Sequence, residues 1–180
     1  MTDFPFPTFR RFLDAVLARS THRESPLHGE AHWRAVTHTA LELTPLVPGA
    51  DPLVGFLFGL IHDSKRVHDG GDPHHGPRAA ALTQELYGEG LLPIKPAQLT
   101  TLSHAIYDHT SGRWSDDPTI GLCWDADRLN LWRCSVTPDP AYLSTAAARD
   151  PQRIRAHRSL PGQHTPWTAL YEQLAKLETP

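Results

Sequence analysis

The sequence of 180 residues contains little cysteine and no long apolar run. Its two cysteines, Cys123 and Cys134, are too few for the disulfide framework of a small secreted domain. No apolar stretch reaches the roughly 20 residues that cross a bilayer, and the first residues carry an acid and prolines where a signal peptide would be apolar. We therefore expect both cysteines to be reduced and the protein to be cytoplasmic, without a membrane partner.

An excess of charge of one sign is also missing. The formal net charge is −3, so the chain has no general basic surface of the kind that a dedicated nucleic-acid binder carries. Hydrophobic residues make up 39% and charged residues 21%, which is typical of a globular protein. We expect a single domain over residues 1–180, because this length is enough to bury a sizeable core.

Alternating strand patterns of useful length are absent, and helical periodicity takes their place. Several of the 17 prolines follow an Asp or Thr, as in Asp51-Pro52, Asp117-Pro118 and Thr165-Pro166, which is the order that starts a helix. Apolar spacing predicts helices near residues 9–18, 29–43, 53–61, 76–87, 96–108, 118–130 and 166–177. Residues 135–163 show an irregular pattern that predicts no element. The fold class is therefore all-α.

Histidine is frequent, and most of the 12 histidines lie in the middle of the chain. His62-Asp63 closes the apolar run 53–61, where a buried imidazole and carboxylate are costly without a partner. His32 lies on a helical stripe of apolar residues, and Asp127 lies one turn after Cys123. Imidazole nitrogens and carboxylate oxygens are common ligands of divalent cations. This pattern predicts a metal site.

In their order and helical context, these residues resemble the HD-domain phosphohydrolase superfamily. The resemblance covers about residues 28–130 and rests on His32-Trp33-Arg34-Ala35-Val36, on His62-Asp63 and on Asp127-Arg128-Leu129-Asn130. It implies a compact, HD-domain-like bundle of about six to eight helices, with residues 131–180 as an irregular segment plus a final helix. It also implies that one divalent metal ion is held by His32, His62, Asp63 and Asp127, and that Asp63 is the catalytic carboxylate.

Two further histidines resemble the additional ligands of those relatives that hold two metals. His75 precedes Gly76-Pro77-Arg78-Ala79-Ala80, and His109 follows Ile106-Tyr107-Asp108. A second metal ion would take these two histidines, and Asp63 would then bridge the two ions. The ligand types do not distinguish Mn, Fe, Co, Ni, Zn or Mg.

The resemblance implies a metal-dependent phosphohydrolase, which cleaves a phosphate ester of a small nucleotide or related metabolite through a metal-activated water. Lys65 and Arg66 follow the His-Asp pair, and Arg128 follows Asp127, so we expect these cations to bind the substrate phosphate. Two alternatives remain open. One is a di-iron HD-type oxygenase, which requires both additional histidines and bound iron, and the other is a non-catalytic nucleotide-sensing domain.

Overall fold

The computed structural model of the protein describes residues 4–178, so residues 1–3 and 179–180 of the predicted domain lie outside the described part. The described residues form nine α-helices and four 3₁₀-helices and contain no strand, which confirms the all-α fold class. The α-helices are α1 (Phe6–Arg19), α2 (Glu30–Leu43), α3 (Pro52–Ile61), α4 (His75–Gly88), α5 (Pro96–Asp108), α6 (Pro118–Leu129), α7 (Ala146–Arg149), α8 (Pro151–Ala156) and α9 (Trp167–Leu177). The 3₁₀-helices are η1 (Thr44–Leu46), η2 (Asn130–Cys134), η3 (Pro140–Tyr142) and η4 (His157–Ser159).

Seven of the α-helices lie where apolar spacing predicts them, and the other two, α7 and α8, lie in the segment that was expected to be irregular. That expectation is wrong because these helices, of 4 and 6 residues, are too short to display an amphipathic period. Both begin at a capping side chain. Thr145 Oγ1 accepts a hydrogen bond from the Ala148 N–H, and the Asp150 carboxylate accepts one from the Gln152 N–H.

The Asp-Pro pairs start helices as predicted. The carboxylates of Asp51 and Asp117 each accept hydrogen bonds from two main-chain N–H groups in the first turn of α3 and α6. The prediction that Thr165 caps the last helix is wrong. Pro166 has extended backbone and occupies the N-cap position, so α9 begins one residue later, at Trp167.

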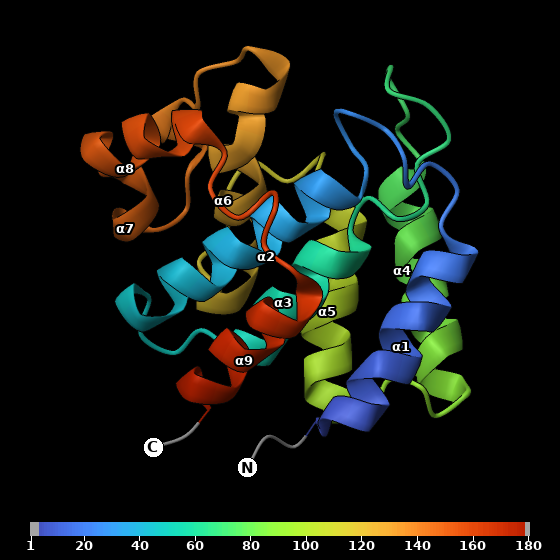
Figure 1. Cartoon of the computed structure of the whole chain (residues 1–180). Helices are drawn as coiled ribbons and strands as arrows, with labels where there is room; N and C mark the ends of the chain where they lie inside the picture. The colour runs from blue at the N-terminus through green and yellow to red at the C-terminus, as the bar shows by residue number, and fades with distance from the viewer. Residues whose placement is uncertain (1–3, 179–180) are drawn as a thin grey trace.

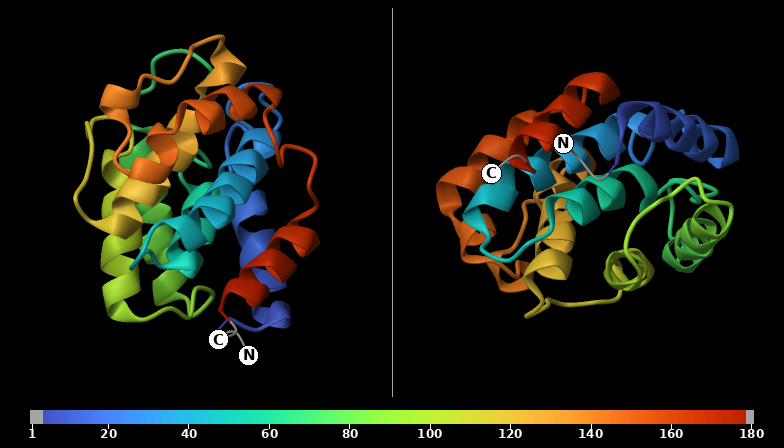
Figure 2. Two further views of the ribbon diagram at one scale, coloured as in Figure 1. Left: turned by 90° about the vertical axis from the view of Figure 1, so that its left-hand side faces the viewer. Right: turned by 90° about the horizontal axis from the view of Figure 1, so that it is seen from below.

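Helices α2 and α3 pack against each other at the centre of the molecule, with α5, α6 and α9 around them (Figure 1). Helices α4 and α5 form an antiparallel pair that is seen nearly end-on from below (Figure 2, right). The buried ring of Phe9 in α1 stacks on the ring of Tyr171 in α9, with centroids 4.9 Å apart. Aromatic packing therefore joins the first described helix to the last.

The crossing of α2 and α3 depends on a glycine. A Cβ atom added to Gly59 would lie 2.3 Å from Thr37 Oγ1 and 2.5 Å from the Thr37 main-chain nitrogen. Any larger residue would force the two helices apart. The close approach brings His32 of α2 and His62, which follows α3, to the same place in the core.

A second glycine has the same effect on α4 and α5. A Cβ atom at Gly76 would lie 2.8 Å from the carbonyl oxygens of both Ile106 and Tyr107. The first turn of α4 therefore rests directly on the last turn of α5. His75 and His109, which stand at these two helix ends, meet as a result.

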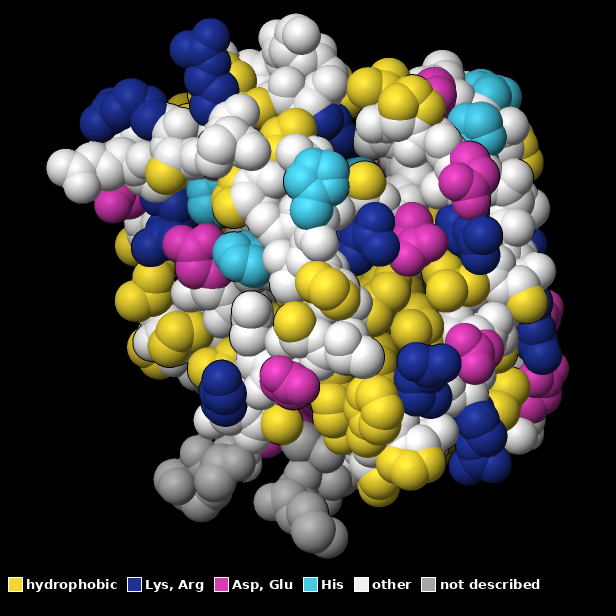
Figure 3. Space-filling model, in the orientation of Figure 1, with side chains coloured by type: hydrophobic (Ala, Val, Ile, Leu, Met, Phe, Trp, Pro, Cys, Tyr) yellow, Lys and Arg dark blue, Asp and Glu magenta, His cyan; other side chains and the backbone are white. Residues whose placement is uncertain are grey.

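On the face shown in Figure 3, Lys and Arg side chains are interspersed with Asp and Glu side chains. Among the described residues, no helix combines the length and the apolar character that a membrane span requires. Cys123 is buried and Cys134 is partly buried, and neither forms a disulfide with a described residue.

Candidate metal centre and its cavity

The structure brings together all six side chains that were predicted as metal ligands. They come from α2 (His32), from the residues that follow α3 (His62 and Asp63), from the first residue of α4 (His75), from the C-cap of α5 (His109) and from the last turn of α6 (Asp127). Five of the six are buried, and the side chain of Asp127 is 15% exposed. The packing of these five helices therefore assembles the cluster.

Two groups of three ligand atoms lie close enough to hold an ion, and Asp63 belongs to both. In the first group, the Nε2 atoms of His32 and His62 lie 3.2 Å apart, and each lies 3.6 Å from Asp63 Oδ2. In the second, the Nε2 atoms of His75 and His109 lie 2.7 Å apart and are 3.1 and 3.7 Å from Asp63 Oδ1. Asp63 therefore directs one carboxylate oxygen at each histidine pair.

Asp127 adds a second carboxylate to the first group. Its Oδ1 atom lies 3.2 Å from His32 Nε2 and 3.9 Å from His62 Nε2. This oxygen is buried and makes no hydrogen bond within the described part of the chain, while the Arg133 guanidinium lies 3.5 Å away. A buried carboxylate oxygen in that situation fits a cation. The buried His and Asp groups could therefore hold a metal ion, as the sequence predicted.

Hydrogen bonds at helix ends orient three of the imidazoles. The Nδ1 atom of His62 donates to two carbonyls of the last turn of α3 at 3.2 Å, and that of His109 donates to a carbonyl of the last turn of α5 at 2.7 Å. His75 Nδ1 donates to the Asp72 carbonyl. In the neutral ring this arrangement leaves a lone pair on Nε2, and each Nε2 faces the cluster.

The protonation states suit a cation. Burial lowers the pKa of His32 to about 4 and that of His62 to about 3, so both rings are neutral at neutral pH. Burial would raise the pKa of Asp63, but the neighbouring imidazoles, His62 first, hold it well below its usual value. Burial would also raise the pKa of Asp127, but the charge of Arg133 is the main effect that holds it well below its usual value. Neutral imidazoles and ionised carboxylates are the forms that ligate metals.

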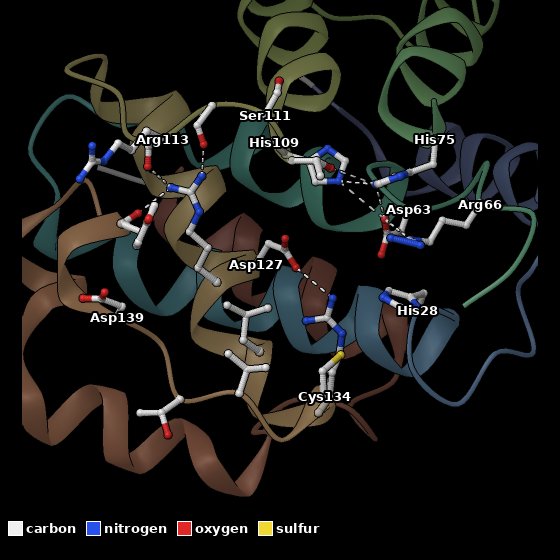
Figure 4. Close-up of a pocket in the computed structure, with 18 residues that line it drawn as sticks. His28, Asp63, Arg66, His75, His109, Ser111, Arg113, Asp127, Cys134 and Asp139 are labelled. Atoms are coloured by element: carbon white, nitrogen blue, oxygen red, sulfur yellow. Dashed lines mark hydrogen bonds and ion pairs between the residues drawn. The ribbon is translucent and has the colours of Figure 1, made fainter. Parts of the chain in front are cut away.

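A cavity of about 560 Å³ adjoins the cluster, a size that suits a small-molecule ligand. Asp63, His75, His109 and Asp127 line one part of it (Figure 4). Farther from the cluster, the lining includes Arg113, Arg128, Val136, Asp139 and Tyr142. The candidate metal site is thus open to a space large enough for a small molecule.

Of the predicted phosphate-binding cations, Arg66 lines this cavity and Lys65 does not. Arg66 Nε lies 3.3 Å from Asp63 Oδ1, beside the cluster. Lys65 Nζ instead donates to the main-chain carbonyl of Arg19, at the end of α1, at 2.9 Å. Carbonyls at the end of a helix lack intrahelical partners and attract a cation. The expectation that Lys65 binds phosphate in this cavity is therefore wrong.

Arg128 lines the cavity, but its guanidinium group is bound to the protein itself. It donates to the carbonyl oxygens of Arg113 at 2.7 Å and Tyr142 at 2.6 Å, and to that of Gly112. The guanidinium also lies over the ring of Trp124, 5.5 Å from its centroid. Because its donors hold two segments of the cavity wall together, the structure gives Arg128 a bracing position rather than the phosphate-binding position that was expected.

Sequence reasoning missed Arg113 as a cation of this cavity. Its side chain is exposed and makes no hydrogen bond or ion pair within the described residues. The guanidinium carbon lies 5.3 Å from the centroid of the Tyr142 ring. No motif marks Arg113 in the sequence, since it belongs to the loop between α5 and α6 and enters the cavity wall only through the fold.

His28 is a second residue that was missed. It is buried, lines the cavity beside Arg66 (Figure 4), and directs its Nδ1 atom at Asp69 Oδ1, 3.0 Å away. Ser25 Oγ donates to the same carboxylate oxygen, and Trp33 Nε1 donates to the His28 carbonyl at 2.7 Å. The signal that could have identified His28 is its position four residues before His32.

Comparison of the chain with protein-family models, with curated proteins and with solved structures gave no match. The residues of this chain must therefore indicate its function. Three features do so: the shared carboxylate of Asp63, the cavity beside it, and the His28–Asp69 pair.

Proposed function

We propose that the protein is a metal-dependent phosphohydrolase of the HD-domain type, which cleaves a phosphate ester of a small nucleotide or related metabolite. The observation that carries this proposal is the Asp63 carboxylate, whose two oxygens face separate histidine pairs at the wall of a cavity. The order His32, His62-Asp63, Asp127 along the chain supports the HD type. A divalent cation bound by these four side chains would lower the pKa of a coordinated water and polarise a phosphoryl oxygen.

The positions of His75 and His109 support the proposal that a second cation binds beside the first. His75 and His109 present their Nε2 atoms to Asp63 Oδ1, while Oδ2 of the same carboxylate faces the first pair. The Nδ1 atoms of both rings are held by carbonyls, which aims the Nε2 lone pairs at one point. Asp63 would then be the ligand that the two cations share.

His28 is suited to protonate the leaving group. The Asp69 carboxylate accepts its Nδ1–H and orients the ring, and Nε2 makes no hydrogen bond within the described residues. As water adds to phosphorus and the ester P–O bond breaks, the departing oxygen requires a proton, which His28 would deliver from Nε2. Burial lowers the pKa of His28, and the hydrogen bond to Asp69 opposes this shift. The carboxylate would therefore stabilise the positive ring before this transfer.

The cavity also offers groups for the rest of the substrate. Arg66 lies beside Asp63, where the phosphate would bind, and its charge would offset that of the phosphoryl oxygens. Arg113 and Tyr142 lie in the part of the wall farther from the cluster, where a second anionic group or a flat ring would bind. These contacts favour a nucleotide-like ester over a bare alkyl phosphate.

The test is phosphate release from an aryl phosphate and a nucleotide panel, with Mn²⁺, Mg²⁺, Co²⁺ or Fe²⁺ supplied in turn. We expect hydrolysis that a chelator abolishes, and a kcat at least about 100-fold lower for Asp63→Asn. Asp116→Asn, which changes an exposed aspartate outside the cavity, serves as the matched control and should keep the wild-type rate. Equal rates for the wild type and Asp63→Asn would contradict the proposal.

A di-iron oxygenase is the second candidate, because it needs the complete set of six ligands, and His75 and His109 join the other four in one cluster. Metal analysis and oxygen uptake separate it from the hydrolase. Zinc or magnesium in the active protein, with no iron, excludes it. A purely structural metal is favoured less, because the cluster borders a cavity of about 560 Å³ rather than a closed protein shell.

A further inference from the structure

His32 differs from the other three histidines of the cluster. His62, His75 and His109 each direct Nδ1 at a main-chain carbonyl, whereas Nδ1 of His32 is buried and makes no hydrogen bond within the described residues. If Nε2 of His32 carries a lone pair for a cation, Nδ1 must carry the proton. A buried N–H group requires an acceptor, and residues 4–178 supply none in direct contact.

A second buried atom without a partner belongs to Asn130. Its Oδ1 makes no hydrogen bond to any residue that the structure describes, while Nδ2 donates to the Ala126 carbonyl at 2.8 Å and to Thr39 Oγ1 at 3.1 Å. Thr39 Oγ1 can accept there because its own proton goes to the Ala35 carbonyl. These two acceptors fix which end of the amide is nitrogen, so Oδ1 is free to accept a hydrogen bond elsewhere.

Both residues border one small cavity, distinct from the substrate cavity. Its volume is about 30 Å³, and His32, Asn130, Leu160 and Gln163 are among the residues that line it. Leu160, one of these lining residues, has left-handed backbone, at φ 51° and ψ 60°. That conformation is unfavourable for a bulky residue and is retained only where the surrounding packing requires it.

The cavity has the size and the polar groups that one water molecule needs. A volume of about 30 Å³ exceeds the roughly 10–15 Å³ that a water requires. One buried donor and one buried acceptor on its lining satisfy the minimum of about two hydrogen bonds. An apolar filling would leave both groups unsatisfied.

We propose that a buried water in this cavity accepts the Nδ1–H of His32 and donates to Asn130 Oδ1, which makes Asn130 a positioning residue for the metal ligand His32. The inference deepens the proposed function and depends on it for the role of His32. Through the water, Asn130 fixes the tautomer that leaves His32 Nε2 unprotonated. The helix-end carbonyls do the same directly for the other three histidines.

A crystal structure of the wild-type protein, at a resolution that shows ordered water, tests the geometry without reference to activity. We expect one water at about 2.7–3.2 Å from both His32 Nδ1 and Asn130 Oδ1. A cavity without that water, or an Asn130 side chain turned away from it, would overturn the inference.

Binding of Zn²⁺, measured by competition with a chelating dye, tests the positioning role. Asn130→Ala should bind Zn²⁺ about 10-fold more weakly than the wild type. Thr39→Val is the matched control: it disturbs the same amide on its Nδ2 side but keeps the Oδ1 acceptor, so its affinity should stay within about twofold of the wild type. Equal weakening in both variants, or none in folded Asn130→Ala, would contradict a positioning role.

The two proposals fail in different ways. A protein that releases phosphate from no substrate, but holds the water and loses Zn²⁺ affinity on Asn130→Ala, refutes the phosphohydrolase and supports the positioning role. A protein that hydrolyses phosphate esters through Asp63, but lacks the water, supports the phosphohydrolase and refutes the positioning role of Asn130.

Discussion

The Nε2 atoms of His75 and His109 lie 2.7 Å apart and both face Asp63 Oδ1. Because carbonyls accept both Nδ1–H groups, the neutral rings would place two lone pairs against each other. Although burial opposes it, the Asp63 carboxylate raises the pKa of His109. The structure therefore favours a positive charge at this point, which a divalent cation would supply.

We predict that metal removal lowers the thermal stability of the protein. An ion that binds the folded state alone stabilises it by about 2.7 kcal/mol at 100 times its dissociation constant. The melting temperature should therefore fall when a chelator replaces Mn²⁺ or Zn²⁺, as followed by circular dichroism.

The second site is tested separately by counting bound ions. The double variant His75→Ala, His109→Ala should hold one ion per chain fewer than the wild type. His104→Ala, an exposed histidine of α5 outside the cluster, should leave the ion content unchanged. A double variant that holds as many ions as the wild type would show that this histidine pair is not a metal site.

We predict that His28→Asn lowers kcat about 100- to 1,000-fold and leaves metal content unchanged, since in the proposed reaction His28 would donate a proton and would not bind the metal. The loss should be larger for an alkyl phosphate, whose leaving oxygen requires a proton, than for a nitrophenyl phosphate. Initial rates on the two substrates measure this difference.

Asp69→Asn should also lower kcat, but less than His28→Asn does, because it removes the charge that orients and stabilises the His28 ring. A uniform loss of rate on both substrates in His28→Asn would contradict a role in protonating the leaving group and would indicate a role in binding.

Arg113 and Arg128 should give opposite results. Arg113→Ala should raise KM for a nucleotide several-fold, with unchanged stability, because its side chain makes no hydrogen bond within the described residues. Arg128→Ala should destabilise the fold by about 2 kcal/mol, because three wall carbonyls lose a charged donor. Steady-state kinetics and urea unfolding measure the two effects. A stable Arg128→Ala with a raised KM would restore Arg128 as a phosphate-binding residue.

Gly59→Ala should destabilise the protein by about 3 kcal/mol, because the added methyl group would meet the main chain of Thr37. Gly88→Ala is the control. That glycine is exposed at the end of α4, where a Cβ atom meets nothing within 4 Å, so the change should be neutral or slightly stabilising. Urea unfolding of both variants tests the pair, and equal stability would mean that α2 and α3 can separate without cost.

The long helices could be predicted because their signals are local, whereas the set of six ligand candidates came from the resemblance to HD domains. Apolar spacing and Asp-Pro starts mark the helices, and His62-Asp63 stands out at the end of an apolar run. The cavity wall could not be predicted, because its residues come from separate loops. Lys65 lies two residues after the predicted metal ligand Asp63, and Arg128 lies next to Asp127, yet main-chain carbonyls of distant segments bind both cations.

Asp125 and Asp127 show the same limit within a single helix. Both are aspartates of α6, two positions apart, and the sequence alone does not determine which enters the core of the site. Asp125 is buried against the chain that follows and accepts hydrogen bonds from the main-chain N–H groups of Ser144 and Thr145. Asp127 faces His32. The resemblance to HD domains assigned Asp127 correctly to the cluster, whereas the anchoring role of Asp125 required the fold.

The division of the Asp63 carboxylate between two histidine pairs has a thermodynamic consequence. An ion at His32 and His62 would fix the carboxylate plane and thereby change the affinity of His75 and His109 for a second ion. By linkage, the second ion would change the affinity for the first by the same factor. The two ions would therefore not bind independently, and a titration with metal should depart from a curve for identical, non-interacting sites.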